Sequence, residues 1–388
     1  MPHDLSRVRR PSLARLGLAA TLIATVGAFS ACSSGGSRGP KLEQVRTLEL
    51  PGDDLARLGY RRDWAGFPFI LAGQRIREIY PDTDGVFIQE TGSTVSMFDV
   101  RTGQRLWNNT LAGPLTKFIS IRRGIVKGSP VLLVTSESDV FALDPQTGNL
   151  LDRQNLRKVA TSGPVVFGDL LIFGTSTGEV MAHLTRVSDK LWGSDLEGPI
   201  EYAPVRIGEL VAAVARSGQI AFLEPTAGSL RGMARMHRGA GANPVAGDNL
   251  VFVPSLDQSL YAFDPYSGSQ VWRLRTSQPI TSQPVAHDGM LYIELAERGL
   301  CALAQTAPAH GSILWSNPDV RGTVIGMRSG RLLVWSGREL VSVSPANGTV
   351  FDRVTINGVA QLVTDNFVDG NLYAVGRGGS VVKLVPLR

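Results

Sequence analysis

The stretch LVFVPSLDQSLYAFDPYSGSQVW, at residues 250–272, decides the fold of this chain. It contains two short runs of β-branched and aromatic residues, at 251–253 and 260–263, and a third run begins near its end. Such runs, separated by turn residues, are the pattern of β-strands. Asp264 and Pro265 open the second turn and Gly268 closes it, because proline presets a turn φ, aspartate accepts from nearby backbone N–H groups, and glycine adopts conformations that side chains resist. The stretch therefore predicts a β-meander with a chemically specified corner.

Six further copies of this unit appear when the chain is aligned on the residue that closes the corner. That residue is Gly103, Gly148, Ser188, Gly228, Gly268, Gly311 or Gly348, and four copies carry tryptophan four positions later, at Trp107, Trp192, Trp272 and Trp315. Segments with a Pro-Val entry, such as 163–169 and 243–249, precede the copies and supply a fourth, inner strand. Four-stranded repeats of 37 to 45 residues are typical of β-propellers.

An eighth copy, at residues 371–386, has two strands of the unit and then the chain ends. We therefore predict an all-β fold, an eight-bladed β-propeller of four-stranded antiparallel blades over residues 41–388, in which the last blade needs one strand from elsewhere. The alternating segment KLEQVRTLEL, at 41–50, is predicted to be this N-terminal closing strand and to pair with the sheet that contains residues 371–387, which leaves no unpaired edge.

Residues 52–73 do not fit the repeat. Asp53 and Asp54 favour a short helix that runs to Leu58, and several aromatic residues follow it, among them Trp64. Because clustered aromatic side chains are usually buried in their own domain, we expect a lid over one end of the ring. A segment that docks on a partner is the alternative.

Residues 1–31 are predicted to be a signal for export. Residues 1–31 have a basic start, an apolar run at 16–28 and a small-residue cleavage site that ends at Cys32, which is the pattern of a signal peptide too short to span a bilayer. Cys32 is the predicted lipidation site, because it stands at the cleavage site and residues 32–40 read as a flexible Ser/Gly tether. An ordinary secreted protein with an unmodified cysteine is the alternative.

Charge and cysteine content restrict the class of protein. The whole chain is +5, and residues 1–31 carry four arginines and one aspartate, a contribution of +3, so the remainder is +2. That near-neutral charge gives no reason to expect a nucleic-acid partner, and membrane attachment is expected from acyl chains. Cys301 would be the one cysteine left after lipidation, so no intramolecular disulfide is possible, and we expect a buried thiol there.

The titratable residues do not form an active-site pattern. The acidic residues Asp99, Asp144, Glu224 and Asp264 occupy the same corner position in different copies, so they are interpreted as turn formers. His183, His237, His287 and His310 are spread over different blades without metal-ligand spacing. We therefore predict no catalytic residue, no metal site and no cofactor.

The corner FDVRTG, at 98–103, with Trp107 four positions after its glycine, and the corner LDPQTG, at 143–148, resemble the quinoprotein-type, or PQQ-like, β-propeller repeats. The layout over nearly all of the mature chain is similar to that of the BamB family of outer-membrane assembly lipoproteins. This resemblance implies a non-catalytic scaffold that is lipid-anchored in the cell envelope, at the outer membrane facing the periplasm, and that acts as a monomeric propeller within a complex beside a barrel-assembly protein.

The resemblance also implies a place of contact, since members of the family use an acidic pair before one Pro-containing inner strand. This chain has Gly-Ala-Gly-Ala at the comparable place, residues 239–242. Two other functions stay open for such a propeller, a PQQ-dependent quinoprotein-type enzyme and a binder of glycan or peptidoglycan.

Turns between the second and third strands of all blades must lie on one face of a propeller. They hold an acidic run at 137–139 in the second blade, Arg216 in the fourth, Arg298 in the sixth, Arg338 in the seventh and Arg377 in the eighth. Arginine is enriched at interfaces, so we predict that Arg298, Arg338 and Arg377 bind an acidic partner surface or anionic head groups. The alternative is compositional, because the chain has 33 arginines and 6 lysines and exposed turns would hold arginine anyway.

Overall fold

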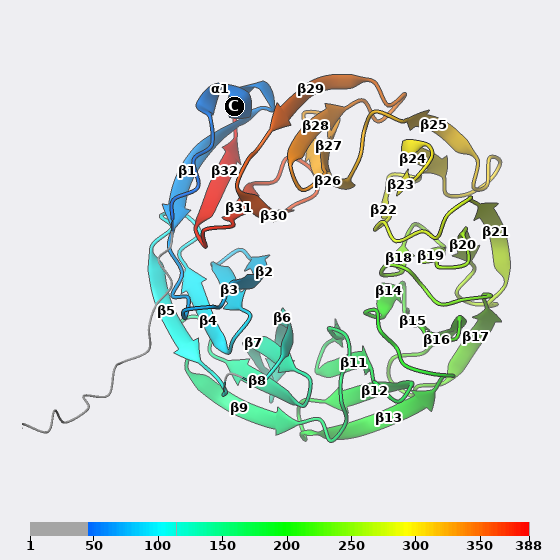
Figure 1. Ribbon diagram of the computed structural model, residues 1–388. Helices are drawn as coiled ribbons and strands as arrows, with labels where there is room; N and C mark the ends of the chain where they lie inside the picture. Colours follow the sequence, from blue (N-terminus) through cyan, green and yellow to red (C-terminus); the bar gives the residue numbers. More distant parts are fainter. Residues whose placement is uncertain (1–45, 114, 388) are drawn as a thin grey trace, which may run out of the picture. The chain divides into compact units, whose positions relative to one another are not determined.

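A computed structural model describes residues 46–113 and 115–387 and shows eight four-stranded antiparallel sheets in a ring around a common axis (Figure 1). The predicted eight-bladed all-β propeller is thereby confirmed. The described residues form one short helix, α1 (Gly52–Arg57), and every other element is a strand. Each sheet except the last follows chain order, with its first strand nearest the axis.

We number the sheets as blades 1 to 8. The first four are blade 1, β2 (Ile76–Pro81), β3 (Val86–Glu90), β4 (Thr94–Phe98) and β5 (Arg105–Thr110); blade 2, β6 (Phe118–Val126), β7 (Ser129–Ser136), β8 (Asp139–Leu143) and β9 (Leu150–Asn155); blade 3, β10 (Val165–Phe167), β11 (Leu170–Gly174), β12 (Glu179–Leu184) and β13 (Asp189–Asp195); and blade 4, β14 (Val205–Ile207), β15 (Leu210–Val214), β16 (Gln219–Leu223) and β17 (Leu230–Arg235).

The remaining blades complete the ring. They are blade 5, β18 (Val245–Ala246), β19 (Val251–Ser255), β20 (Ser259–Phe263) and β21 (Gln270–Arg275); blade 6, β22 (Val285–His287), β23 (Met290–Leu295), β24 (Gly299–Ala304) and β25 (Ile313–Asn317); blade 7, β26 (Thr323–Arg328), β27 (Arg331–Trp335), β28 (Glu339–Val343) and β29 (Val350–Thr355); and blade 8, β30 (Val359–Thr364), β31 (Leu372–Gly376), β32 (Val381–Pro386) and β1 (Tyr60–Gly66).

The closing strand of blade 8 is β1, so the prediction that residues 41–50 close the ring is wrong. β1 runs antiparallel to β32, from Tyr60 opposite Pro386 to Gly66 opposite Val381, with an irregularity near Asp63. The segment 41–50 is described from Arg46 onwards, and there it makes a single parallel bridge to Gly379. The alternation of apolar and polar residues in 41–50 indicates that one side of the segment is apolar, but it does not specify which strand the segment pairs with. The outer strand of blade 8 is β1, which has larger side chains.

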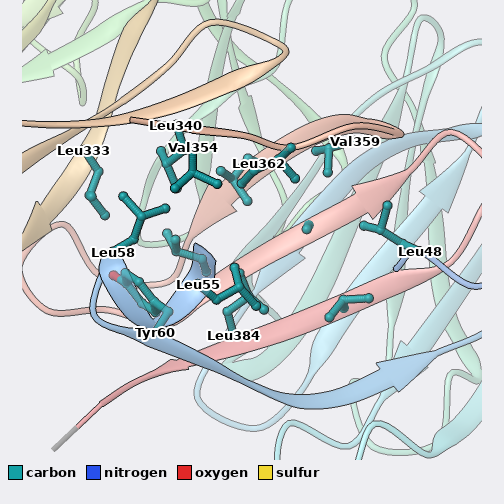
Figure 2. Close-up of a cluster of buried hydrophobic side chains, with 14 residues drawn as sticks. Leu48, Leu55, Leu58, Tyr60, Leu333, Leu340, Val354, Val359, Leu362 and Leu384 are labelled. Atoms are coloured by element: carbon teal, nitrogen blue, oxygen red, sulfur yellow. The ribbon is translucent and has the colours of Figure 1, made fainter. Parts of the chain in front are cut away.

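The predicted short helix is confirmed, but the lid over the ring is wrong. Residues 52–58 form α1 and its end, and the chain then continues directly into β1. The helix buries Leu55 and Leu58 in a cluster with Tyr60, Leu340 and Leu384 (Figure 2). Tyr60 and Trp64 therefore serve the junctions of blade 8 with blades 7 and 1, whereas Phe67 is exposed.

The core is built between blades. The second and third strands of each blade are buried along most of their length, as in β3 and β4, because both faces of a sheet in a propeller are covered by neighbouring sheets. One cluster, for example, combines Phe87 and Met97 of blade 1 with Phe118 and Phe141 of blade 2. The buried apolar area thus holds neighbouring sheets together.

A repeated contact joins tryptophan in one outer strand to the corner of the next blade. Trp107 Nε1 donates to the Pro145 carbonyl at 3.1 Å, and its ring covers Gly148, whose φ is +73° and whose missing Cβ would lie 2.5 Å from the ring. The same contact joins Trp64 to Val100 and Gly103, Trp192 to Pro225 and Gly228, Trp272 to Gln305 and Gly311, and Trp315 to Pro345 and Gly348. The corner glycine is therefore required both by its backbone and by the indole above it.

Candidate partner-binding face

The strand directions place all the turns between second and third strands on one face. These turns are residues 91–93, 137–138, 175–178, 215–218, 256–258, 296–298, 336–338 and 377–380. The connections from each outer strand to the next inner strand return to the same face, because neighbouring strands are antiparallel. We call this surface the arginine face, since Arg216, Arg298, Arg338 and Arg377 all lie in these turns.

Three of these arginines are exposed and have no internal partner. Among residues 46–113 and 115–387, the guanidinium groups of Arg298, Arg338 and Arg377 form no ion pair and no hydrogen bond. Arg216 differs, because it lies 3.5 Å from Glu201. An exposed guanidinium group without a carboxylate partner keeps its five donors available to another molecule.

The acidic residues next to the arginines are engaged elsewhere. Glu339, adjacent to Arg338, pairs with Arg353 at 2.7 Å, and Glu297, adjacent to Arg298, accepts a hydrogen bond from the Ser277 hydroxyl. The carboxylates that stand beside these arginines in the sequence therefore do not neutralise them by direct contact.

The acidic run of blade 2 is not an exposed counterpart to the arginines. Asp139 is the first residue of β8, and its side chain is 8% exposed and lies 3.3 Å from Arg153. Burial raises the pKa of Asp139, but hydrogen bonds from Ser138 and Arg153 outweigh burial and hold this pKa below its usual value. Glu137 pairs with Lys117 at 3.0 Å, so both carboxylates of this turn have partners.

A groove of about 650 Å³ opens on the arginine face between blades 5 and 6. It is lined by the connection that follows β21, with Arg275 and Pro279, and by the turn that contains Ala296 and Arg298. At two neighbouring junctions a residue of the turn donates its N–H to the matching connection, from Arg216 to Pro199 at 2.8 Å and from Leu256 to Gly239 at 3.0 Å. Within the described chain Ala296 and Pro279 make no such bond, so the two segments stand apart there.

The three predicted arginines share a face but not a pocket. Arg298 lines the groove between blades 5 and 6, whereas Arg377 lines a second groove, of about 1280 Å³, between blades 8 and 1. Arg338 lines neither of the two. Arg275 in the first groove, and Arg46 and Arg75 in the second, were not found by reasoning on turns, although the connections they flank return to the same face as the turns.

The repeated corner acids hold turns. Asp264 Oδ1 accepts from the backbone N–H groups of Tyr266 at 3.0 Å and Ser267 at 2.7 Å, and the bond from Ser267 is the largest cause of its lowered pKa. Asp99 does the same with Arg101 and Thr102. These carboxylates are turn formers, as interpreted from their positions in the repeat.

The remaining nucleophile and imidazole candidates are buried or scattered. Cys301 is buried, which confirms the expected environment, and burial raises its thiol pKa to about 11. His183 is buried with its Nε2 atom 2.7 Å from Gln154 Oε1. In the part of the chain that the structure describes, no three or more His, Cys, Asp or Glu residues are arranged to hold a metal ion.

The predicted lipidation site lies outside the described residues, because Cys32 belongs to residues 1–45. Within the described ranges, no helix has the length and hydrophobicity that a bilayer-crossing segment requires.

Comparison with known proteins adds the family. The family model described as outer membrane protein assembly factor BamB matches residues 71–231 and 216–387 of this chain. The outer membrane protein assembly factor BamB of Yersinia pestis is 23% identical, and the match covers 61% of this chain and 64% of that protein, so the chain spans less than two thirds of the length of this relative.

Solved structures support the fold. The crystal structure of BamB from Moraxella catarrhalis matches with a TM-score of 0.62 and 18% identity, over 83% of this chain and 98% of that one. The C-terminal WD40 domain of Sif2 matches with a TM-score of 0.65 and 11% identity, over 84% and 98%. At such identities the likeness is one of fold, and the family rests on the sequence match. Since that match extends from residue 71 to residue 387, the chain belongs to the family of the outer membrane protein assembly factor BamB.

Proposed function

We propose that this protein is a non-catalytic, lipid-anchored scaffold of outer-membrane protein assembly, placed on the periplasmic side, and that a protein partner docks on the arginine face. The observation that carries the proposal is the set of exposed arginines without internal partners, Arg298, Arg338 and Arg377, on one face of a propeller of this family. Cys32 is the proposed attachment point of the lipid. The propeller works as a monomer that presents this surface within a complex.

The groove between blades 5 and 6 is the proposed centre of contact. Its long rims are backbone segments, and Arg275 and Arg298 lie along it, a combination suited to an extended acidic segment that uses both main-chain hydrogen bonds and charge. Glu294 and Glu297 also line the groove. Glu294 lies 3.5 Å from Arg321 and Glu297 accepts from the Ser277 hydroxyl, so among the described residues neither carboxylate pairs with Arg275 or Arg298.

The segment 239–242 supports a shift of the contact toward the arginines. A Cβ on Gly239 would lie 2.7 Å from the Arg216 backbone oxygen, and one on Gly241 would lie 2.1 Å from the Ile280 oxygen. Ala240 and Ala242 are buried. This junction has no room for the acidic side chains that the family resemblance leads one to expect, so recognition by this chain has to use other residues.

The test is capture of the partner from crosslinked membranes with the triple variant Arg298→Glu, Arg338→Glu and Arg377→Glu. We expect at least about a tenfold loss of the captured barrel-assembly protein, because three favourable contacts become repulsive, with no change in the melting temperature. The amount captured is measured by quantitative mass spectrometry.

A matched control carries the same charge change away from this face, as Arg62→Glu, Arg101→Glu and Arg231→Glu, all exposed residues without an ion pair among those described. The control should capture as much partner as the unmodified protein. Equal capture by the first triple variant, or equal loss in the control, would remove the arginine face from the proposal.

A further inference from the structure

The groove between blades 8 and 1 has a charge pattern that the other charged pockets lack. Arg46, Arg75 and Arg377 all line it, and Glu49 is the only acidic residue among its lining side chains. None of these four charged groups forms an ion pair within the described residues. The side chains therefore leave a local excess of two positive charges around a space of about 1280 Å³.

Another polar pocket on the same pair of blades shows the contrast. There Arg122 lies 2.7 Å from Glu78, and Lys383 lies 3.3 Å from Asp63 and donates to the Val100 carbonyl at 2.7 Å. Its cations are thus neutralised by the protein itself, whereas the cations of the arginine-face groove are not. An unneutralised arginine cluster in a cavity is a binding site for an anion that offers several acceptor oxygens.

The floor of the groove adds small residues and donors. Gly376, Gly378 and Gly379 line it beside Arg377. A Cβ on Gly378 would lie 2.9 Å from Arg46 Cβ and one on Gly376 would lie 3.2 Å from Leu48 Cβ, so these glycines let the segment with Arg46 pack closely at the groove. The Gln74 side-chain oxygen Oε1 accepts from the Thr91 hydroxyl at 2.6 Å, and the Gln74 side chain also carries an NH₂ group, which is a donor. A phosphate group, with its several oxygens, matches this set of donors.

The path of the chain connects this groove to the membrane. Arg46 donates its N–H to the Gly378 carbonyl at 2.9 Å, and Leu48 donates to Ser380 Oγ at 2.9 Å, so the N-terminal segment is fixed on the arginine face beside the groove. Cys32 precedes Arg46 by 14 positions, a span of at most about 50 Å for an extended chain. If Cys32 carries the anchor, as the proposed function states, the length of the tether keeps Arg46 within about 50 Å of the membrane surface.

We propose that the groove between blades 8 and 1 binds the phosphate of anionic phospholipid head groups, so that this side of the arginine face rests on the membrane. The inference rests on the proposed anchor for its geometry and on the unpaired arginines for its chemistry. The other groove of the same face, with Arg275 and Arg298, stays available to the protein partner. One face thus serves two ligands at two grooves. The vesicle test leaves Arg377 unchanged, because the proposed function also uses it.

The test uses the mature chain with Cys32→Ala, so that no acyl chain contributes, and measures co-sedimentation with vesicles of phosphatidylcholine alone or with added phosphatidylglycerol. We expect binding to the vesicles that contain phosphatidylglycerol, weakened by salt. Each arginine near an anionic surface strengthens binding by about fivefold, so Arg46→Glu with Arg75→Glu should weaken it by about twenty-fold or more.

The matched control is Arg275→Glu with Arg298→Glu, which changes the charge of the same face equally but at the other groove. It should keep most of the vesicle binding. Equal loss in both double variants would show a general effect of charge and overturn the groove. Binding of inorganic phosphate without any sedimentation on phosphatidylglycerol vesicles would assign the site to free phosphate and overturn the head-group proposal.

A third outcome separates lipid from protein. If Arg46→Glu with Arg75→Glu binds vesicles normally but captures less crosslinked partner, the groove belongs to a protein and the inference is wrong. Because the tested chain lacks the acyl anchor, failure of vesicle binding leaves the scaffold proposal standing, and failure of partner capture leaves the vesicle result standing.

Discussion

Single tryptophan and glycine residues connect neighbouring blades along much of the ring. Where the chain lacks the tryptophan, the contact with the corner of the next blade differs too. Asp152 precedes Ser188 at one junction, and at another Gly232 takes the place of the tryptophan and its backbone lies against Gly268, at 2.5 Å from the Cβ that Gly232 lacks. The two positions therefore act as one unit, although they belong to different repeats.

This pairing predicts an unequal effect of the same substitution at two glycines. Gly148→Ala places a methyl group 2.5 Å from the Trp107 ring, so the indole has to move and its hydrogen bond is lost, and φ of +73° adds strain of about 1 to 2 kcal/mol. We expect the free energy of unfolding to fall by about 3 to 5 kcal/mol in total. Denaturant titration measures it.

Gly330→Ala is the control, because Gly330 has the same φ of +73° and no atom within 4 Å of its missing Cβ. Its free energy of unfolding should fall only by the backbone strain, about 1 to 2 kcal/mol. Similar losses in the two variants would mean that the indole contact contributes nothing.

At the residue scale, the sequence predicted the role of some positions and hid that of others. The turn chemistry of Asp264 and Gly268 was readable because it is local. Trp64 was assigned to a lid because no repeat precedes it in the sequence. Its sheet is blade 8, whose other strands lie at the far end of the chain, and the corner that it covers belongs to blade 1. The pair between Glu339 and Arg353 was likewise invisible, and it decides that Arg338 stays free.

At the scale of elements, β1 decides whether the ring is closed. It contributes two large buried side chains, Tyr60 and Trp64, which are 1% and 7% exposed, and covers the edge of β32 along six paired positions. An uncovered edge presents unpaired N–H and C=O groups to other chains. The strand therefore protects blade 8 from association as well as stabilising it.

Removal of β1 should have a far larger effect than removal of the segment before it. A chain that begins at Phe67 lacks β1, α1 and the buried Leu55, and we expect it to aggregate or to form oligomers through β32. A chain that begins at Arg46 keeps these elements, and we expect its melting temperature to match that of the mature protein.

Thermal unfolding and size-exclusion chromatography distinguish the two truncated chains. A monomeric chain from Phe67 with an unchanged melting temperature would contradict closure by β1.

The sequence could predict eight blades because the corner recurs in each repeat. It could not choose between residues 41–50 and β1, because the partner strand β32 lies more than 300 residues away and no local pattern encodes such a pairing.

On the scale of the whole molecule, the ring gathers turns from different repeats onto one face. Strand alternation alone predicted that Arg298, Arg338 and Arg377 share this face. The grooves were not predictable from the sequence. Each depends on the distance between the connection that joins two blades and the turn of the following blade, as at Pro279 and Ala296. Whether an arginine is free also depends on contacts between strands, which spacing along the chain does not specify.

The anchor predicts a separation between folding and localisation. Cys32→Ala should leave the melting temperature unchanged, because the residues that form the blades do not include the tether, and should move the protein from the membrane fraction to the soluble fraction after a high-salt wash. Salt removes the weaker contact expected from the head-group groove. Cell fractionation followed by immunoblotting measures the change. A variant that still sediments with membranes after the wash would show that a protein partner holds it there.

Blade 8 unites the first strand of the fold with the last, and this sets an order in time. Val381 follows Gly66 by 315 positions, which a ribosome that adds roughly 5 to 20 residues per second needs about 15 to 60 seconds to synthesise. For that whole interval β1 has no partner, since β32 does not yet exist. The circle can be completed only after the final strand has been made, and until then the polypeptide keeps an open end.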